Sequence, residues 1–379
     1  MFSASFSFIP QSLRAPTASP RAPRVTALAY APNGQKLAAV TTERVVFLFD
    51  ENGEKKDRFK ARSSVKDAAA ARPFHVRGMA FSPDSTRLAV AQSDNIVFIY
   101  KLGSEWGDKK SICNKFEVPT PVTCVCWSPS DPNLVAFGCA DGSVRAGYLR
   151  TNKTDTLYTR APVTAICTSP DGRSLATAHT DGAIVLFDFA DAGSFRQLAV
   201  HPCPPSFLAW GVDLAAAGPS GHVVFYESRS GRARSTFPPD PDAPTADVGC
   251  GAASPAGDTV VVAAHDALVV YSWRPRELKW EQTGRRAVPN MYAGTALAFR
   301  PDGAGVVVGT LTGCVDVFES MLRKVKYVGT DAMGHAKEVH LSYTSKSQVR
   351  LRDATTGASI AGESCCVWME EAACLSGVV

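Results

Sequence analysis

The sequence lacks several features that would assign it to common functional classes. It has no apolar run of about 18 residues, which an α-helix needs to cross a bilayer, so we expect no transmembrane segment. It has no glycine-rich phosphate-binding loop and no Gly-x-Ser-x-Gly nucleophile elbow. These absences argue against a membrane-spanning protein and against common classes of enzyme.

Acidic residues are missing from the start of the chain. The 379 residues include 40 basic and 36 acidic side chains, with a formal net charge of +4. The whole excess lies before Glu43, where the chain carries Arg14, Arg21, Arg24 and Lys36. Because the remainder is neutral, it has no overall positive field, and we expect no nucleic-acid partner.

Residues 1–24 are rich in serine, arginine and proline and contain no acid, which is the bias of organelle transit peptides. The alternative is a flexible leader with one strand, from Phe6 onward, that closes the fold. The segment lacks the apolar core of a secretory signal, so we do not expect secretion.

The eleven cysteines do not form the pattern of a disulfide framework. Their number is odd, no Cys-x-x-Cys pair occurs, and most of them lie in apolar runs. Cys124 and Cys126 alternate on one face of an expected strand, where a thiol acts as a small apolar group. We therefore expect free thiols in a reduced, cytosolic compartment.

A repeated pattern of three apolar runs and two turns occupies most of the chain. Its copies begin at Val25, Val76, Val122, Val163, Ser206, Asp247 and Gly294. Turn prolines recur at intervals of 41–51 residues, with one double interval of 85 across a copy without a proline. This period is typical of β-propeller blades. The runs are short and rich in β-branched and aromatic residues, which favours strands over helices.

Each copy predicts three strands of a blade, and the variable stretch before the next copy predicts the fourth. Pro-Asp and Pro-Asn-Gly sequences suit the first turn, and Asp141-Gly142 and Asp181-Gly182 suit a tight second turn. Seven such sheets can close into a ring that leaves no open edge. We therefore predict an all-β fold, a seven-bladed β-propeller over residues 25–329, with an irregular carboxy-terminal tail.

The innermost strands offer few groups for chemistry. They begin with small residues, as in Val25-Thr26-Ala27, and the charged exceptions are Arg77 and Asp247. Propeller enzymes place carboxylates and imidazoles around the central axis, so we predict no catalytic residue, no cofactor and no metal. His179 and His265 lie near second turns, where we expect hydrogen bonds within the turn.

The repeats resemble degenerate WD-repeat blades. Pairs such as Phe49-Asp50 and Phe187-Asp188 replace the terminal Trp-Asp, and the opening Gly-His pair is missing. The connections are more specific. The 41-residue stretch from Val76, which contains Glu105-Trp106-Gly107-Asp108-Lys109-Lys110, is similar to the amino-terminal propeller of one family. That family is the largest WD-repeat subunit of intraflagellar transport complex B, and the resemblance runs from about Val25 to about Arg323.

The resemblance implies a non-catalytic scaffold of the cytoplasm and the cilium, including flagellum and basal body. It also implies binding to other complex B subunits, including a calponin-homology-domain subunit at the first propeller. The basic insertion that starts at Glu54 is interpreted as a solvated loop. The alternative is contact with an acidic partner or with lipid headgroups at a membrane surface. The second hypothesis for function is a general WD-repeat adaptor in coat or vesicle traffic.

The family also carries a second propeller and a helical repeat, which do not follow here. After Met321 we predict one alternating run only, over Val349 to Arg352, and poor order over residues 330–379, with Trp368 partly exposed. This tail is alternatively a remnant of the second propeller. A short isoform, a fragment and a misread gene product would each account for the departure.

Trp106, Lys109 and Lys110 are the candidate partner-binding residues. They lie in a connection, where blades differ and partners bind, and tryptophan is frequent at interface hot spots. The alternative is that Trp106 covers the gap between two adjacent blades.

Overall fold

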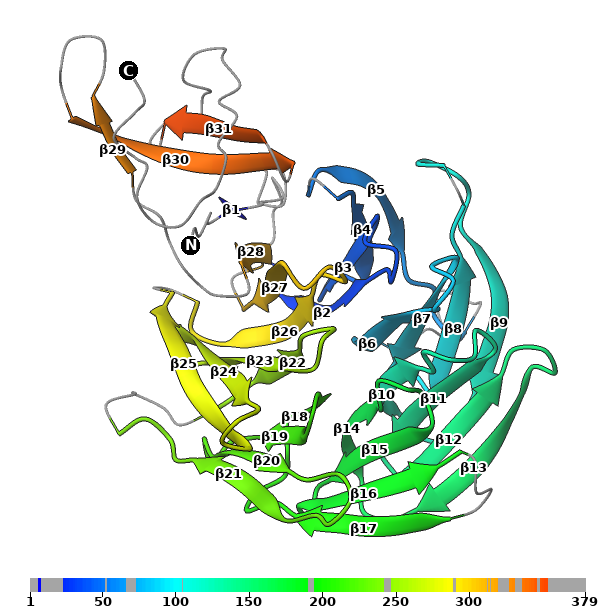
Figure 1. Cartoon of the computed structure of the whole chain (residues 1–379). Coiled ribbons are helices and arrows are strands. Elements are labelled where there is room, and N and C mark those ends of the chain that lie inside the picture. Colours follow the sequence, from blue (N-terminus) through cyan, green and yellow to red (C-terminus); the bar gives the residue numbers. More distant parts are fainter. Residues whose placement is uncertain are drawn as a thin grey trace. The chain divides into compact units, whose positions relative to one another are not determined.

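The computed structural model describes residues 6–7, 23–319, 327–330, 336–345 and 348–353. Short gaps occur at 52, 66–72, 104, 190–193, 242–246, 289–290, 312 and 314. Within these ranges, seven four-stranded sheets surround a central opening (Figure 1). The predicted all-β, seven-bladed propeller is confirmed.

The first four blades follow the chain from the amino-terminal side. Blade 1 contains β2 (Val25–Tyr30), β3 (Leu37–Thr41), β4 (Val45–Phe49) and β5 (Lys55–Lys60). Blade 2 contains β6 (Val76–Phe81), β7 (Arg87–Gln92), β8 (Ile96–Lys101) and β9 (Ser111–Glu117). Blade 3 contains β10 (Val122–Trp127), β11 (Leu134–Cys139), β12 (Ser143–Tyr148) and β13 (Lys153–Thr159). Blade 4 contains β14 (Val163–Thr168), β15 (Ser174–His179), β16 (Ala183–Asp188) and β17 (Phe195–Val200).

The last three blades include the weakest copy of the repeat. Blade 5 contains β18 (Phe207–Trp210), β19 (Leu214–Ala217), β20 (Val223–Tyr226) and β21 (Ala233–Phe237). Blade 6 contains β22 (Cys250–Ala253), β23 (Thr259–Ala264), β24 (Ala267–Arg274) and β25 (Lys279–Ala287). Blade 7 contains β26 (Gly294–Phe299), β27 (Gly305–Thr310) and β28 (Val315–Glu319), with β1 (Phe6–Ser7) next to β28.

The turns behave as their residues predict. Gly142 and Gly182 adopt φ values of +85° and +81°, which glycine reaches without a steric cost. In the first turns, aspartate side chains accept hydrogen bonds from the residues that follow them, as Asp171 does from the backbone N–H of Arg173 at 3.1 Å. Each turn therefore reverses the chain within a few residues and returns it to its own sheet.

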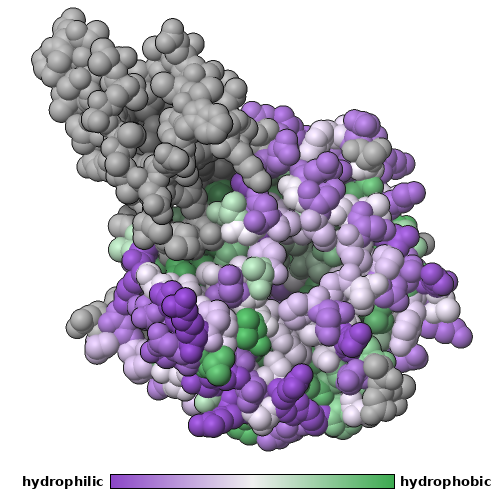
Figure 2. Space-filling view, in the orientation of Figure 1, coloured by the Kyte–Doolittle hydropathy of each residue, from purple (hydrophilic) through white to green (hydrophobic). Residues whose placement is uncertain are grey.

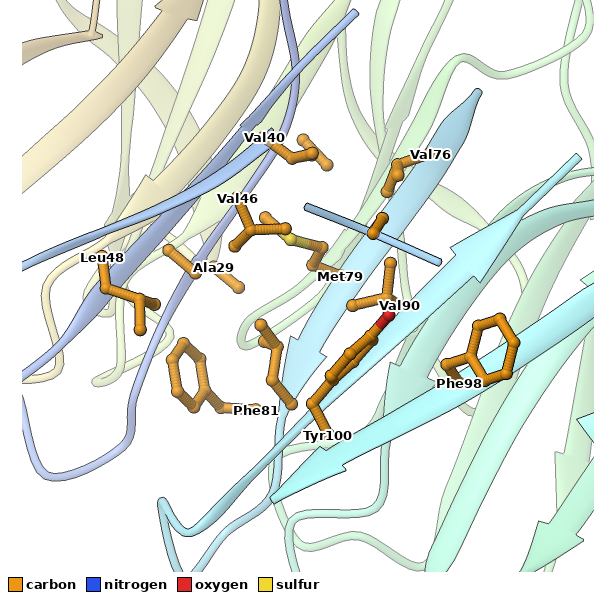
Figure 3. Close-up of a cluster of buried hydrophobic side chains, with 14 of the residues drawn as sticks. Ala29, Val40, Val46, Leu48, Val76, Met79, Phe81, Val90, Phe98 and Tyr100 are labelled. Atoms are coloured by element: carbon orange, nitrogen blue, oxygen red, sulfur yellow. The ribbon is translucent and has the colours of Figure 1, made fainter. Parts of the chain in front are cut away.

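The core lies between neighbouring blades, because each sheet buries both of its faces. Figure 3 shows this for blades 1 and 2, where Val40, Val46 and Leu48 face Met79 and Val90 across the gap. Val40, Val46 and Val90 are completely buried. A fully buried side chain of this size contributes roughly 1.5–3 kcal/mol, so repeated contacts of this kind hold the ring together.

Five of the seven inner strands share one irregularity. In β2, β6, β10, β14 and β26 the pairing with the second strand shifts at the second residue, which forms a β-bulge. The bulge residues are Thr26, Arg77, Thr123, Thr164 and Thr295. In β18 and β22 the pairing runs without a shift. A bulge adds local twist, which suits strands crowded around an axis.

The sheet order of blade 7 bears on how the ring closes. β1 lies beside β28, so the outer position of this sheet is taken by residues from the amino terminus. Deletion of residues 1–24 should therefore lower the melting temperature by roughly 5 °C or more, because β28 loses its outer neighbour β1 and becomes an open edge. Calorimetry of the shortened chain measures this. An unchanged melting curve would instead favour closure by the segment after Met321 and a targeting role for the leader.

The residues after the propeller form a separate three-stranded antiparallel sheet of β29 (Tyr327–Thr330), β30 (Ala336–Ser345) and β31 (Gln348–Asp353). The expectation of one alternating run, Val349 to Arg352, was wrong. That run lies in β31, but β30 contains a second alternation through Val339, Leu341 and Tyr343. Trp368 and the rest of 354–379 lie outside the described residues.

Candidate partner-binding surface

The connection between β8 and β9 in blade 2 carries the residues predicted to bind a partner. Asp108 Oδ2 accepts a hydrogen bond from the backbone N–H of Glu105 at 3.1 Å, and Gly107 adopts a φ of +88°. This tight turn presents Trp106 to solvent, with 37% of its surface exposed. Lys109 is exposed as well.

Trp106 contacts the neighbouring blade through Lys36, which follows the first turn of blade 1. The Lys36 ammonium lies 5.1 Å from the centre of the Trp106 ring and donates a hydrogen bond to the Gly103 carbonyl oxygen at 2.9 Å. Burial lowers the pKa of Lys36, and the nearby charge of Lys110 lowers it further. Lys36 therefore holds the connection of blade 2 against blade 1.

Lys110 forms an ion pair with Asp57 on β5, the outer strand of blade 1. Asp57 also accepts a hydrogen bond from the backbone N–H of Gly107 at 3.2 Å. Burial alone would raise the pKa of Asp57, but the hydrogen bonds from Lys110 and from backbone N–H groups hold it below its usual value. The charge of Lys110 is therefore already paired within the protein.

The structure thus brings together Trp106 and Lys110 with two residues that the sequence did not indicate, Lys36 and Asp57. These contacts cover the gap between blades 1 and 2, as the alternative for Trp106 predicted. No local signal could have found the two partners, which lie 70 and 53 positions away from Trp106 and Lys110. The exposed side of Trp106 and Lys109 remain available, and their role in partner binding stays a prediction.

The described residues contain no cluster of three or more histidine, cysteine, aspartate or glutamate side chains that could hold a metal ion. His179 does not bond within its turn as predicted. Its ring lies 2.6 Å from the Ala161 carbonyl oxygen and 3.1 Å from the Thr177 hydroxyl, because the side chain turns inward and is fully buried. Burial lowers the pKa of His179. His265 Nε2 lies 3.7 Å from Asp266 Oδ2, which is within its turn but beyond hydrogen-bond distance.

Seven of the cysteines lie in the described ranges, and all seven are free thiols. Burial raises the pKa of Cys124 and of Cys250 to about 12. These thiols are therefore protonated and unreactive at neutral pH, which fits a packing role. The described residues also contain no helix whose length and hydropathy would allow it to cross a membrane.

Comparison with known families first confirms the blade type. Residues 71–101, which include β6 to β8, match the WD domain G-beta repeat. Residues 125–213 match the WD40 domain of anaphase-promoting complex subunit 4. Both matches fall on blades that the strand pairing defines, so the WD-type propeller is confirmed by an independent observation.

Relatives that align with most of the chain indicate its family more specifically than the blade matches do. The chain is 41% identical over 346 residues to intraflagellar transport protein 172 of Chlamydomonas reinhardtii, and 38% identical over 344 residues to its homologue in Homo sapiens. Each alignment covers 89% of this chain. Over most of its length, the chain is a homologue of intraflagellar transport protein 172. The resemblance that residues 76–116 indicated is confirmed.

The same family includes the intraflagellar transport protein osm-1 of Caenorhabditis elegans, which is 34% identical over 335 residues. The chain spans about a fifth of the length of these relatives, 18% of osm-1 and 19% of the Chlamydomonas and human proteins. The similarity to intraflagellar transport protein 172 therefore concerns a propeller region of a much longer protein.

Proposed function

We propose that this chain is a non-catalytic protein-interaction module of intraflagellar transport, which acts within complex B and supports cilium assembly and ciliary transport. The observation that carries the proposal is 34–41% identity to intraflagellar transport proteins over 88–89% of the chain. Identity at this level across the blades extends beyond what the blade pattern alone requires. The module would act in the cytoplasm and in the cilium, including the flagellum and basal body.

The connections between strands, where blades differ, would serve this role. Its partners would be other complex B subunits, with a calponin-homology-domain subunit among them. The proposed contact is the exposed side of Trp106 with Lys109, while Lys110 supports the surface through its ion pair with Asp57. A large aromatic ring that Lys36 already holds in place loses little conformational entropy on binding, which favours affinity.

Affinity capture tests the function and the surface separately. The purified chain, immobilised and exposed to flagellar extract of ciliated cells, should enrich complex B subunits over an unrelated WD propeller, as read by mass spectrometry. Trp106→Ala should reduce this recovery by about tenfold or more, because loss of a hot-spot residue costs at least about 2 kcal/mol. Tyr148→Ala is the matched control, since Tyr148 is 38% exposed on another blade.

The outcomes distinguish the two parts of the proposal. If Trp106→Ala recovers as much complex B as the unchanged chain, Trp106 is not part of the binding surface. The proposed ciliary function would still stand. Recovery of coat or vesicle-traffic proteins in place of complex B by the unchanged chain would favour the general adaptor. Melting curves of both variants establish that the ring remains folded.

A further inference from the structure

One blade departs from the bulge pattern of the inner strands. Four of the five bulge residues are threonines, Thr26, Thr123, Thr164 and Thr295, and the fifth is Arg77 in blade 2. The threonines have a structural use. Thr123 Oγ1 donates a hydrogen bond to the Gly138 carbonyl oxygen at 3.1 Å, and Thr26 Oγ1 donates one to the Val40 carbonyl oxygen at 3.4 Å.

Both acceptors lie directly opposite the bulge, because Gly138 pairs with Cys124 and Val40 pairs with Ala27. A short hydroxyl therefore reaches a carbonyl oxygen of the adjacent strand of its own blade. In blades 4 and 7 the hydroxyl oxygens of Thr164 and Thr295 are buried, without a partner in the described part of the chain. The threonine hydroxyl therefore finds an acceptor in some blades and packs without one in others.

Arg77 does not fill this role. Its side chain is exposed, and among the described residues it forms no hydrogen bond and no ion pair. Asp94, the acid in the second turn of the same blade, already accepts a hydrogen bond from the Ser64 backbone N–H at 2.9 Å. Because no internal contact orders the Arg77 side chain, it keeps its rotamer freedom and adds no contact to the fold. The packing of blade 2 gives no reason for a long cation at this position.

Arg77 is an exposed residue on β6, the strand of blade 2 nearest to the central opening. β6 is the innermost strand of its blade (Figure 1), and Arg77 is its second residue, so it lies at the end where the chain enters the ring. The equivalent residues of the flanking blades are Thr26 and Thr123. Figure 2 shows the surface hollowed at the centre of the ring. One unpaired cation between hydroxyl-bearing strands is suited to receive an anionic group.

We propose that Arg77 binds a carboxylate of an acidic segment of a partner protein at this mouth of the central opening. A guanidinium presents parallel N–H donors in a fork that matches a carboxylate, and it stays charged at every physiological pH. The site is distinct from the Trp106 surface. Successive strands of an antiparallel blade alternate in direction, so the start of β6 and the connection from β8 to β9 lie at opposite ends of blade 2. The proposal does not depend on a ciliary role.

Fluorescence anisotropy with a fluorescein-labelled oligoglutamate peptide tests this proposal on the full chain, with an oligoglutamine peptide of equal length as the neutral control. Arg77→Thr restores the pattern of the other blades and should fold normally. It should weaken oligoglutamate binding by about tenfold, the effect of losing one charge-assisted contact. Arg58→Thr is the matched control, because it removes an exposed arginine from the outer strand β5 with the same change in net charge. It should weaken binding by less than about twofold.

The affinity of Arg77→Lys for oligoglutamate should lie between those of the unchanged chain and Arg77→Thr. Lysine keeps the positive charge but lacks the forked N–H donors of arginine. The proposal is wrong if Arg77→Thr binds oligoglutamate as the unchanged chain does, if Arg58→Thr loses as much affinity, or if oligoglutamate binds no better than oligoglutamine. It is also wrong if inorganic phosphate displaces the peptide while free glutamate does not, because the site would then select phosphate. A melting temperature of Arg77→Thr equal to or above that of the unchanged chain excludes loss through misfolding.

Discussion

Replacement of Asp213 by alanine should lower the free energy of unfolding by about 3 kcal/mol, because it leaves two polar groups without their buried acceptor. Asp213 lies in the turn between β18 and β19 of blade 5 and is 2% exposed. Its carboxylate accepts a hydrogen bond from Trp280 Nε1 at 3.0 Å and lies 2.9 Å from Arg234 Nε. Burial raises the pKa of Asp213, and these two partners oppose that effect.

This carboxylate links two blades. Trp280 comes from β25 of blade 6 and stacks on Phe225 of blade 5, with ring centres 4.3 Å apart. Loss of the carboxylate therefore weakens the contact between blades 5 and 6 as well as the turn. The expected loss stays at the lower end for a buried pair, because Arg234 is partly exposed and keeps a second partner, Glu227, at 2.9 Å.

Denaturant unfolding followed by circular dichroism measures the effect. Glu281→Ala is the matched control, because Glu281 also pairs with an arginine, Arg274, but both side chains are about half exposed. An exposed pair contributes up to about 1 kcal/mol, so the control should lose less than that. A loss for Asp213→Ala no larger than that of Glu281→Ala would show that the buried carboxylate does not stabilise the junction.

Gly142→Ala should also destabilise the chain strongly, by about 2–5 kcal/mol. Gly142 lies in the second turn of blade 3 with a φ of +85°, which an L-residue adopts only under strain. A Cβ atom there would lie 1.7 Å from the Arg160 carbonyl oxygen, which is backbone and cannot rotate away. Either the turn or the connection into blade 4 has to move, and the hydrogen bond from the Arg160 N–H to the Gly142 carbonyl oxygen, at 3.0 Å, would weaken.

Gly34→Ala separates the backbone strain of a positive φ from the steric overlap of an added Cβ atom. Gly34 has a φ of +74°, but no atom lies within 4 Å of the position that its Cβ would occupy. Its replacement should therefore cost only the conformational strain, about 1–2 kcal/mol. The measurement is the difference between the two variants in the same unfolding experiment. Equal losses would mean that the connection at Arg160 yields without cost and that the close approach does not matter.

Much of this fold was predictable from the repeat. Alternating apolar residues, turn prolines and Asp-Gly pairs recur at a blade-length period, and local chemistry alone places three strands and two turns in each copy. The prediction failed where the local signal was ambiguous. In β30 the alternation through Val339, Leu341 and Tyr343 covers only five residues, and polar residues on both sides weaken the strand signal.

The sequence by itself determined the blade architecture and the relationship to intraflagellar transport protein 172, because both depend on patterns along the chain. Only the tertiary structure decided which distant residues meet. Lys36 lies against Trp106, Lys110 pairs with Asp57, and Trp280 bonds to Asp213. Each pair joins two adjacent blades, and its geometry depends on how the twisted sheets pack around the axis. The same holds for Arg77, whose departure from its neighbours becomes meaningful only when five bulges are seen to occupy one structural position.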